Sequence, residues 1–192
     1  MHTEYEVRIL EIDVEKVISR LEELKATKEW DCVQKRYVYD FIPKLDSKWI
    51  RLRTNGKKTT LTIKNVVTSE IDGTQELEVE VDNFERTHLI LKELGYEAKA
   101  FQENRRVQYI INGVEVDIDY WPQIPTYLEV EGASEEAVYN VVEALGFTKE
   151  DCTSLDVDSI YKSYGIELSK INDLKLEEER KWQIGKNYNT EV

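Results

Sequence analysis

The sequence is poor in the residues on which cysteine and histidine chemistry depends. Its 192 residues include two cysteines and two histidines, and none of them stands in a recognisable motif. Cys32 and Cys152 are far apart, so we expect two reduced thiols rather than a disulfide. No Ser-His-Asp or Cys-His arrangement and no glycine-rich phosphate loop can be read from the chain. This scarcity argues against a zinc site and against covalent catalysis.

Positive charge and long apolar runs are also scarce. The chain has 26 Lys and Arg against 39 Asp and Glu, a formal net charge of −13. General binders of DNA or RNA need a basic footprint, which this balance does not provide. No window approaches the roughly 18 apolar residues of a membrane-spanning helix. The start, MHTEYEV, shows neither the basic nor the apolar region of a signal peptide. We therefore expect a cytoplasmic protein with no nucleic-acid or membrane partner.

What the sequence does have is regular alternation of polar and apolar residues, together with an apolar content of 41%. Period-two alternation, which is typical of strands, covers 3–10, 30–42, 48–54, 58–67, 74–82, 99–111, 114–121 and 126–131. Helical spacing fits 14–25, 84–94 and 135–145, and the tail from about 156 also looks helical. Asp13 and Ser134 stand where helix N-caps are expected, and Gly95 and Gly146 stand where helices should end. The order of these elements predicts an α+β fold with a mostly antiparallel sheet.

Two Asn-Gly pairs predict tight hairpins. Asn55-Gly56 and Asn112-Gly113 each separate two alternating stretches, and Asn-Gly is the strongest short hairpin signal. If both pairs close two-residue turns, the expected cross-strand partners are Arg53 with Lys58, Arg51 with Thr60, Arg106 with Asp119, and Gln108 with Asp117.

Several predicted strands carry full charges on one face and apolar residues on the other. In TEYEVRI, Glu4, Glu6 and Arg8 share a face, and the apolar residues between them share the opposite one. The same pattern recurs in Arg51-x-Arg53, Glu76-x-Glu78-x-Glu80, Asp117-x-Asp119 and Glu129-x-Glu131. One explanation is a sheet with a single solvated face. The other is a closed barrel with a charged lumen and helices packed on its apolar exterior. The repeated pure charge pairs favour the barrel.

Such a lumen needs ligands, because unpaired buried charge is costly. The excess of carboxylates calls for divalent cations, and ligands that are all oxygen favour Mg²⁺ or Mn²⁺ over zinc. The clustered arginines call for a polyanion, since the guanidinium fork matches phosphate oxygens. A metal-chelated polyphosphate or nucleoside triphosphate meets both demands.

The charged motifs also stand in a characteristic order, which is Glu4-x-Glu6-x-Arg8, Arg51-x-Arg53, Lys64, Glu78-x-Glu80, Arg106, Asp119 and Glu129-x-Glu131. This order resembles the CYTH superfamily, the triphosphate tunnel metalloenzymes, over about residues 3–165. The family includes class IV adenylate cyclases, thiamine triphosphatases and inorganic tripolyphosphatases. The resemblance implies an eight-stranded antiparallel closed β-barrel, which we assign to residues 1–165. The helical pattern of the tail predicts a separate C-terminal helical segment, 166–192. Residues 177–192 are charged, and we expect them to fray.

The resemblance also implies roles for individual residues. Phosphate contacts would come from Arg8, Arg51, Arg53, Lys64 and Arg106, of which Arg8, Lys64 and Arg106 would also act in catalysis. Ligands for Mg²⁺ or Mn²⁺ would come from Glu4, Glu6, Glu78, Glu80, Asp119, Glu129 and Glu131. Two positions depart from the family pattern, because Arg8 and Asn104 stand where lysine is usual. These departures bear on turnover and substrate choice more than on phosphate binding.

Three functions follow from these motifs. The first is hydrolysis of a small-molecule triphosphate, which could be inorganic triphosphate, a nucleotide or thiamine triphosphate. The second is conversion of ATP to cyclic AMP and pyrophosphate by attack of the ribose 3′-hydroxyl. The third is a non-catalytic module that binds polyphosphate or nucleotide. A homodimer through the tail helix or an exposed strand edge is compatible with the sequence.

Overall fold

The structure is a computed structural model that describes residues 2–68 and 70–177. Its strands are β1 (His2–Ile9), β2 (Thr27–Asp40), β3 (Lys48–Thr54), β4 (Thr59–Val66), β5 (Thr74–Val81), β6 (Ala98–Ile111), β7 (Val114–Tyr120), β8 (Tyr127–Gly132), β9 (Cys152–Thr153) and β10 (Asp173–Leu174). The helices are α1 (Val14–Glu23), α2 (Phe84–Glu93), α3 (Glu135–Ala144) and α4 (Val157–Ser163), with 3₁₀ turns η1 (Lys149–Asp151) and η2 (Leu168–Lys170). The eight long strands and the first three helices confirm the sequence prediction.

The eight long strands form a closed antiparallel barrel. They are hydrogen-bonded in the order β6-β2-β3-β4-β5-β1-β8-β7, and β7 pairs back with β6 to close the circle. Closure gives each of these strands a hydrogen-bonded neighbour on both sides, although β1 and β5 pair only over His2–Glu4 and Thr74–Glu76. The short strand β9 adds to β1, and β10 runs parallel to β6. The predicted fold class, an α+β barrel with helices outside, is therefore confirmed.

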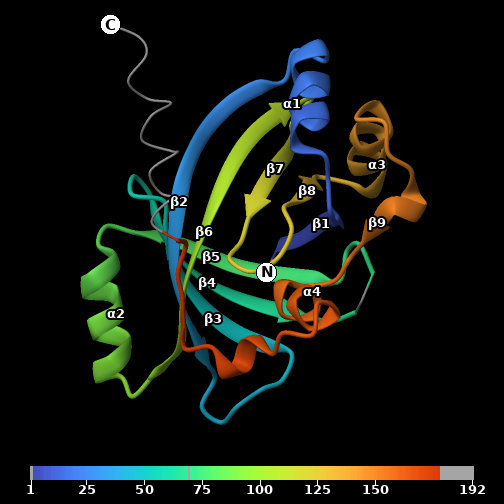
Figure 1. Cartoon of the computed structure of the whole chain (residues 1–192). Coiled ribbons are helices and arrows are strands. Elements are labelled where there is room, and N and C mark those ends of the chain that lie inside the picture. Colours follow the sequence, from blue (N-terminus) through green and yellow to red (C-terminus); the bar gives the residue numbers. More distant parts are fainter. Residues whose placement is uncertain (1, 69, 178–192) are drawn as a thin grey trace, which may run out of the picture.

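The main apolar core lies outside the barrel. Helices α1 and α3 pack their buried faces on the outer faces of β1, β6, β7 and β8. Helix α2 covers β2 and β3 through Leu91, which packs with Tyr39, Ile50 and Leu52. Figure 1 shows α1 and α3 on one side of the barrel and α2 on the other. Because the outer face takes the apolar residues, the alternating polar residues face the lumen.

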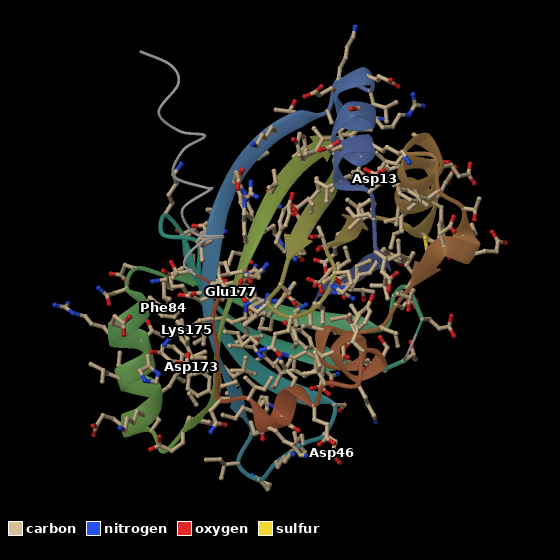
Figure 2. All side chains as sticks on the ribbon, in the orientation of Figure 1. Asp13, Asp46, Phe84, Asp173, Lys175 and Glu177 are labelled. Atoms are coloured by element: carbon tan, nitrogen blue, oxygen red, sulfur yellow. The ribbon has the colours of Figure 1, made fainter. Side chains whose placement is uncertain are left out.

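The helices begin and end at the residues that the sequence indicated. Asp13 lies at the start of α1 (Figure 2). Its carboxylate accepts a hydrogen bond from the backbone amide of Lys16. Ser134 caps α3 in the same way. Gly95 and Gly146 follow the C-caps of α2 and α3 with φ of 90° and 93°, a region that glycine enters without a steric penalty.

One of the two predicted hairpin registers is wrong. Asn112 and Gly113 both have positive φ, and Ile111 pairs with Val114, as a two-residue turn requires. Arg106 therefore pairs with Asp119, and Gln108 with Asp117, as predicted.

At Asn55-Gly56, however, only the glycine has positive φ, so the two-residue turn does not form. The Asn55 side chain instead accepts hydrogen bonds from the amides of Lys57 and Lys58, which makes a four-residue loop. Arg53 then pairs with Thr60, and Arg51 with Thr62. The register moves by two residues, so every side chain keeps its predicted face.

The tail is less helical than its sequence indicates. Helix α4 ends at Ser163, and after η2 the chain extends into β10, where Leu174 pairs with Gln102. Leu168 and Leu174 are buried against Trp121 and Tyr161, so apolar anchors fix this segment without continuous helix. The predicted fraying of 177–192 falls almost wholly outside the described residues, and the domain division at 165 stays a prediction.

Two smaller expectations can also be compared with the structure. Cys32 and Cys152 are both free thiols, as predicted. Within residues 2–68 and 70–177, no helix is both long and apolar enough to cross a membrane.

Candidate functional site

The barrel lumen contains a cavity of about 910 Å³. Every predicted site residue except Glu80 and Asp119 lines it, namely Glu4, Glu6, Arg8, Arg51, Arg53, Lys64, Glu78, Arg106, Glu129 and Glu131. Register explains this convergence, because alternate residues of each strand point inward and neighbouring strands align them. On β1 and β8, for example, Glu6 lies opposite Glu131, and Arg8 lies opposite Glu129.

One side of the lumen is an acidic wall, formed by Glu4 and Glu6 of β1 and Glu129 and Glu131 of β8. Carboxylate oxygens of Glu6, Glu129 and Glu131 lie within 4.8 Å of one another. Burial, reinforced by repulsion from Glu4, Glu129 and Glu6, raises the pKa of Glu131 to about 8. The pKa of Glu4 is also raised, mainly by burial. Burial would also raise the pKa of Glu129, but Arg8 and Arg106 outweigh it and lower that pKa. Glu4 and Glu131 are thus the crowded carboxylates, whose repulsion a bound dication would relieve.

This donor set fits a hard divalent cation. All of the converging ligand atoms are carboxylate oxygens, which Mg²⁺ and Mn²⁺ prefer over the nitrogen and sulfur ligands typical of zinc. In the part of the chain that the structure describes, it is the one group of Asp, Glu, His and Cys side chains close enough to share an ion. Glu6, Glu129 and Glu131 would therefore hold the metal, with Glu4 beside them.

Two lumen arginines are held firmly by carboxylates. Arg8 pairs with Glu129 at 2.7 Å and Glu6 at 3.1 Å, and it donates to the Leu155 carbonyl at 2.9 Å. Burial alone would lower the pKa of Arg8, but these carboxylates raise it well above its usual value.

Arg106 is held in the same manner from the neighbouring strands. Its guanidinium contacts Asp117 at 2.5 Å, Asp119 at 2.5 and 2.8 Å, and Glu129 at 2.9 Å. The carboxylates outweigh burial and raise the pKa of Arg106 as well. Lys64 is a third paired cation, which contacts Glu4 and Glu76.

The opposite side of the lumen is a basic wall, formed by Arg36 of β2 and by Arg51 and Arg53 of β3. The polar contacts of Arg51 are long, at 3.5 Å to Glu76, 3.7 Å to Glu78 and 3.5 Å to the Thr62 hydroxyl. Among the described residues, Arg53 has no recorded hydrogen bond or ion pair through its side chain. Burial, followed by repulsion from Arg51 and Arg106, lowers the pKa of Arg53 to about 10. The charges of this wall are therefore largely uncompensated.

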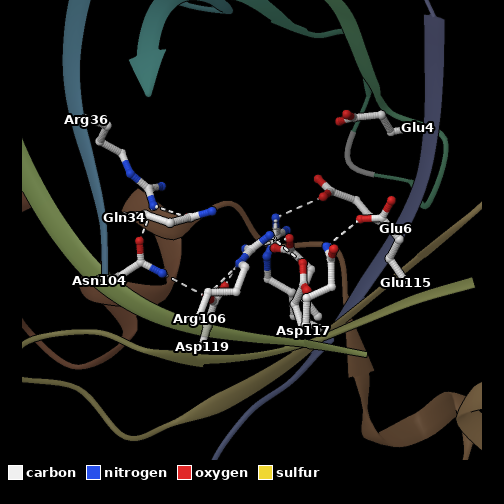
Figure 3. A network of polar contacts seen from close by, with 12 residues as sticks. Glu4, Glu6, Gln34, Arg36, Asn104, Arg106, Glu115, Asp117 and Asp119 are labelled. Carbon is white, nitrogen blue, oxygen red and sulfur yellow. Dashed lines mark hydrogen bonds and ion pairs between the residues drawn. The ribbon is translucent and has the colours of Figure 1, made fainter. Parts of the chain in front are cut away.

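Arg36 was not among the residues predicted from the sequence. Its guanidinium donates to Gln34 at 3.0 Å and to the Asn104 side-chain oxygen. Asn104 in turn donates to Asp119 at 2.8 Å. Figure 3 shows Arg36 and Asn104 on the side of the lumen opposite Glu4 and Glu6. Asn104, which stands where the family usually has lysine, is thus buried and accepts a hydrogen bond from Arg36 of β2.

Three predicted metal ligands are not brought together. Glu80 is 66% exposed through its side chain and pairs with Lys58 at 3.6 Å. Asp119 is fully buried and is held by Arg106 and Asn104. Glu78 lines the cavity, where it accepts a hydrogen bond from Thr62 at 2.7 Å. These positions give no support for a second metal site built from the three residues.

Comparisons with solved structures show that this barrel is a known fold. A protein of Pyrococcus horikoshii is 22% identical, with a TM-score of 0.69 over 80% of this chain and 96% of that one. A Vibrio parahaemolyticus protein described as a candidate adenylate cyclase is 11% identical, with a TM-score of 0.71 over 84% and 98%. A Hippeastrum protein described as having a dominant triphosphatase activity is 17% identical, with a TM-score of 0.56 over 85% and 96%.

Sequence comparison identifies the family. A search of curated proteins returns no match. The family model that describes the CYTH domain matches residues 2–164. This match spans all eight strands of the barrel and the charged residues of its lumen. The chain therefore belongs to the CYTH domain family.

Proposed function

We propose that the lumen binds a triphosphate together with a divalent cation and hydrolyses it. The observation that carries the proposal is the separation of charge across one cavity, where uncompensated arginines face crowded carboxylates. A ligand that satisfies both walls must carry several negative charges and bring a cation with it. A triphosphate chelated to Mg²⁺ or Mn²⁺ has both properties.

The basic wall would orient the phosphate chain. Arg51 and Arg53 lie two residues apart on β3 and both face the lumen, so their guanidinium groups can contact successive phosphates. Arg8, Lys64 and Arg106 are already held by carboxylates, so they would present fixed positive charge with little reorganisation. The burial of these groups strengthens each electrostatic contact because water is excluded.

The acidic wall would hold the metal through Glu6, Glu129 and Glu131, with Glu4 beside them. When bound, the cation supplies Lewis-acid stabilisation of charge on the phosphate oxygens. The protein's part is to crowd the carboxylates before the ligand arrives, so that they need not rearrange to accept it. This preorganisation is consistent with the raised pKa of Glu131.

A second candidate function is cyclisation of ATP to cyclic AMP and pyrophosphate. It is favoured by the extent of the cavity, which continues past the arginines to Trp49 and Leu45 and so has room for more than a phosphate chain. The Vibrio protein with the same fold is described as a candidate adenylate cyclase, whereas the Hippeastrum protein is described as having a dominant triphosphatase activity.

One assay separates these functions. Purified protein is incubated with Mg²⁺ or Mn²⁺ and offered tripolyphosphate, ATP or thiamine triphosphate in separate reactions. Release of free phosphate is the expected result and supports hydrolysis, whereas cyclic AMP with pyrophosphate supports cyclisation. Tight binding without any product would identify a non-catalytic module. Absence of both binding and turnover for all three compounds would overturn the proposal.

A further inference from the structure

Arg36 is a buried cation with no carboxylate partner recorded among the described residues. It is 6% exposed and lines the cavity from β2. Its two hydrogen-bond acceptors are both neutral amide oxygens, those of Gln34 and Asn104. Its Nε atom is buried without a hydrogen-bond partner. A buried arginine usually requires an anion, and residues 2–68 and 70–177 provide none in contact with this one.

The neighbours of Arg36 make its charge less favourable still. It lies directly opposite Arg53 in the pairing of β2 with β3. Burial, followed by repulsion from Arg53, Arg51 and Arg106, lowers the pKa of Arg36 to about 9. The charge of Arg36 is therefore poorly compensated by the residues around it, although Asp119 attracts it from a distance.

The guanidinium is nevertheless held in a fixed position. Its central carbon lies 4.6 Å from the centre of the Trp121 ring, close enough for a cation–π contact. Asn104, which accepts one of its N–H groups, is itself bonded to Asp119. Asp119 is in turn fixed by two contacts from Arg106. A charge that is both rigid and unpaired is suited to an incoming anion.

We propose that Arg36 binds a phosphate group of the substrate, which lies between it and Arg53. This assignment rests on the proposed function and extends the phosphate-binding surface from β3 onto β2. Arg36 and Arg53 repel each other in the free protein, and an anion shared between their guanidinium groups would remove that repulsion. The arginine fork also matches phosphate oxygens better than an ammonium group does.

The test compares how tightly the wild type and variants bind diimidotriphosphate, a tripolyphosphate analogue whose two bridging NH groups resist hydrolysis. Affinity is measured by titration calorimetry with Mg²⁺ for the wild type, Arg36→Gln and Arg36→Lys. Lys35→Gln is the matched control, because Lys35 is the adjacent residue on β2 and is exposed. We expect Arg36→Gln to weaken binding at least about tenfold, Arg36→Lys to weaken it less, and Lys35→Gln to leave it unchanged.

A melting curve of the ligand-free variants distinguishes phosphate binding from a structural role. Arg36→Gln should melt no lower than the wild type, because it removes a buried charge that its neighbours repel. A variant that fails to fold, or melts well below the wild type, would overturn the inference. Wild-type affinity in Arg36→Gln would also overturn it while leaving the proposed function in place. If the wild type itself does not bind the analogue, the proposed function fails, and the assignment of Arg36 fails with it.

Discussion

The acidic wall on β1 and β8 and the basic wall on β2 and β3 are built from the same kind of alternating strand. Some charged residues of the lumen are paired with opposite charges, whereas others on these two walls are surrounded by like charges. Arg8 and Arg106 are surrounded by carboxylates, so their positive charge is matched within the protein. Glu131 has like charges around it, and so does Arg53. Some lumen charges are therefore paired within the protein, whereas Glu131 on one wall and Arg53 on the facing wall have no matching opposite charge among the residues that the structure describes.

This difference separates charges that also stabilise the fold from charges that are matched only when a ligand binds. Paired ions such as Arg106 and Asp119 should support the fold, because removing one partner leaves the other buried and alone. Unpaired ions such as Arg53 should weaken the free protein and act only when a ligand arrives. Substitution of a paired ion should therefore lower stability more than substitution of an unpaired ion, which should mainly reduce activity.

The largest effect is expected for Glu131→Gln on the acidic wall. The variant loses one of the three converging carboxylates, so turnover of tripolyphosphate should fall roughly 100-fold. Phosphate release is measured over a titration of Mn²⁺, and melting temperature is followed in the same titration. Mn²⁺ should stabilise the wild type and have much less effect on the variant.

Glu80→Gln is the matched control for that prediction, since it makes the same change at an exposed carboxylate. We expect activity within about twofold of the wild type, because surface ion pairs contribute little. A large loss of activity in Glu80→Gln would mean that Glu80 is a metal ligand, as the sequence motif predicts, despite its exposed side chain.

Arg53→Gln should have the next largest effect on activity, and it acts on the basic wall. The KM for tripolyphosphate should rise about tenfold, because one charge-assisted contact is lost. The ligand-free variant should unfold at the same temperature as the wild type or higher. Lys57→Gln removes the same charge from the exposed β3–β4 loop and should change neither quantity. A sharp fall in the stability of Arg53→Gln would break the distinction between the walls.

Asp119→Asn tests the paired ions. Arg106 would keep Asp117 and Glu129 but lose a two-point contact in a fully buried site, so the free energy of unfolding should fall by about 3 kcal/mol. Urea denaturation measures the change. The alternative is that Asp119 is a metal ligand, as the resemblance implies. In that case Asp119→Asn would keep its normal stability but would no longer be stabilised by Mn²⁺.

The smallest effect concerns an ordinary pair outside the lumen. Arg105 donates two hydrogen bonds of 2.8 Å to Asp31. Burial alone would raise the pKa of Asp31, but Arg105 outweighs it and the pKa is lowered from 3.8.

A lowered pKa means that this pair stabilises the fold above pH 3.8 and loses its effect as the pH falls through the folded-state value. The free energy of unfolding of the wild type should be about 1–2 kcal/mol higher than that of Asp31→Asn at pH 7. The difference should be much smaller at pH 3. A difference that does not shrink in acid would show that the carboxylate charge is not the source of the stabilisation.

The fold was largely predictable from the sequence because alternation and caps are local properties. Glu4, Glu6 and Arg8 reveal their common face within seven residues, and Asp13 and Gly95 mark the ends of helices directly. The end of the tail was less readable, since Leu174 fits a helical spacing as well as a strand. Its partner on β6 decides between the two, and that partner is distant in sequence.

The site was predictable only in part, because alternation gives a face and not an environment. Glu80 shares its face with Glu78, yet it lies where the side chain is exposed. Arg36 was missed because Val38 interrupts the run of polar side chains on that face of β2. The polar spacing of Gln34-x-Arg36 was the available signal. Its meaning depends on the lack of a contacting carboxylate among the described residues, which only the packed barrel reveals.

The alternation of inward and outward side chains along β3 and β4 limits how this barrel can change during evolution. A duplication or deletion of two residues inside a strand slides the ladder but leaves each side chain on its side of the sheet. A change of one residue would instead turn Arg51 and Arg53 toward the apolar surface under α2, unless a bulge absorbed it. Among descendants of this sequence, strand lengths should therefore drift in even steps, whereas the connecting loops are free to change by any number.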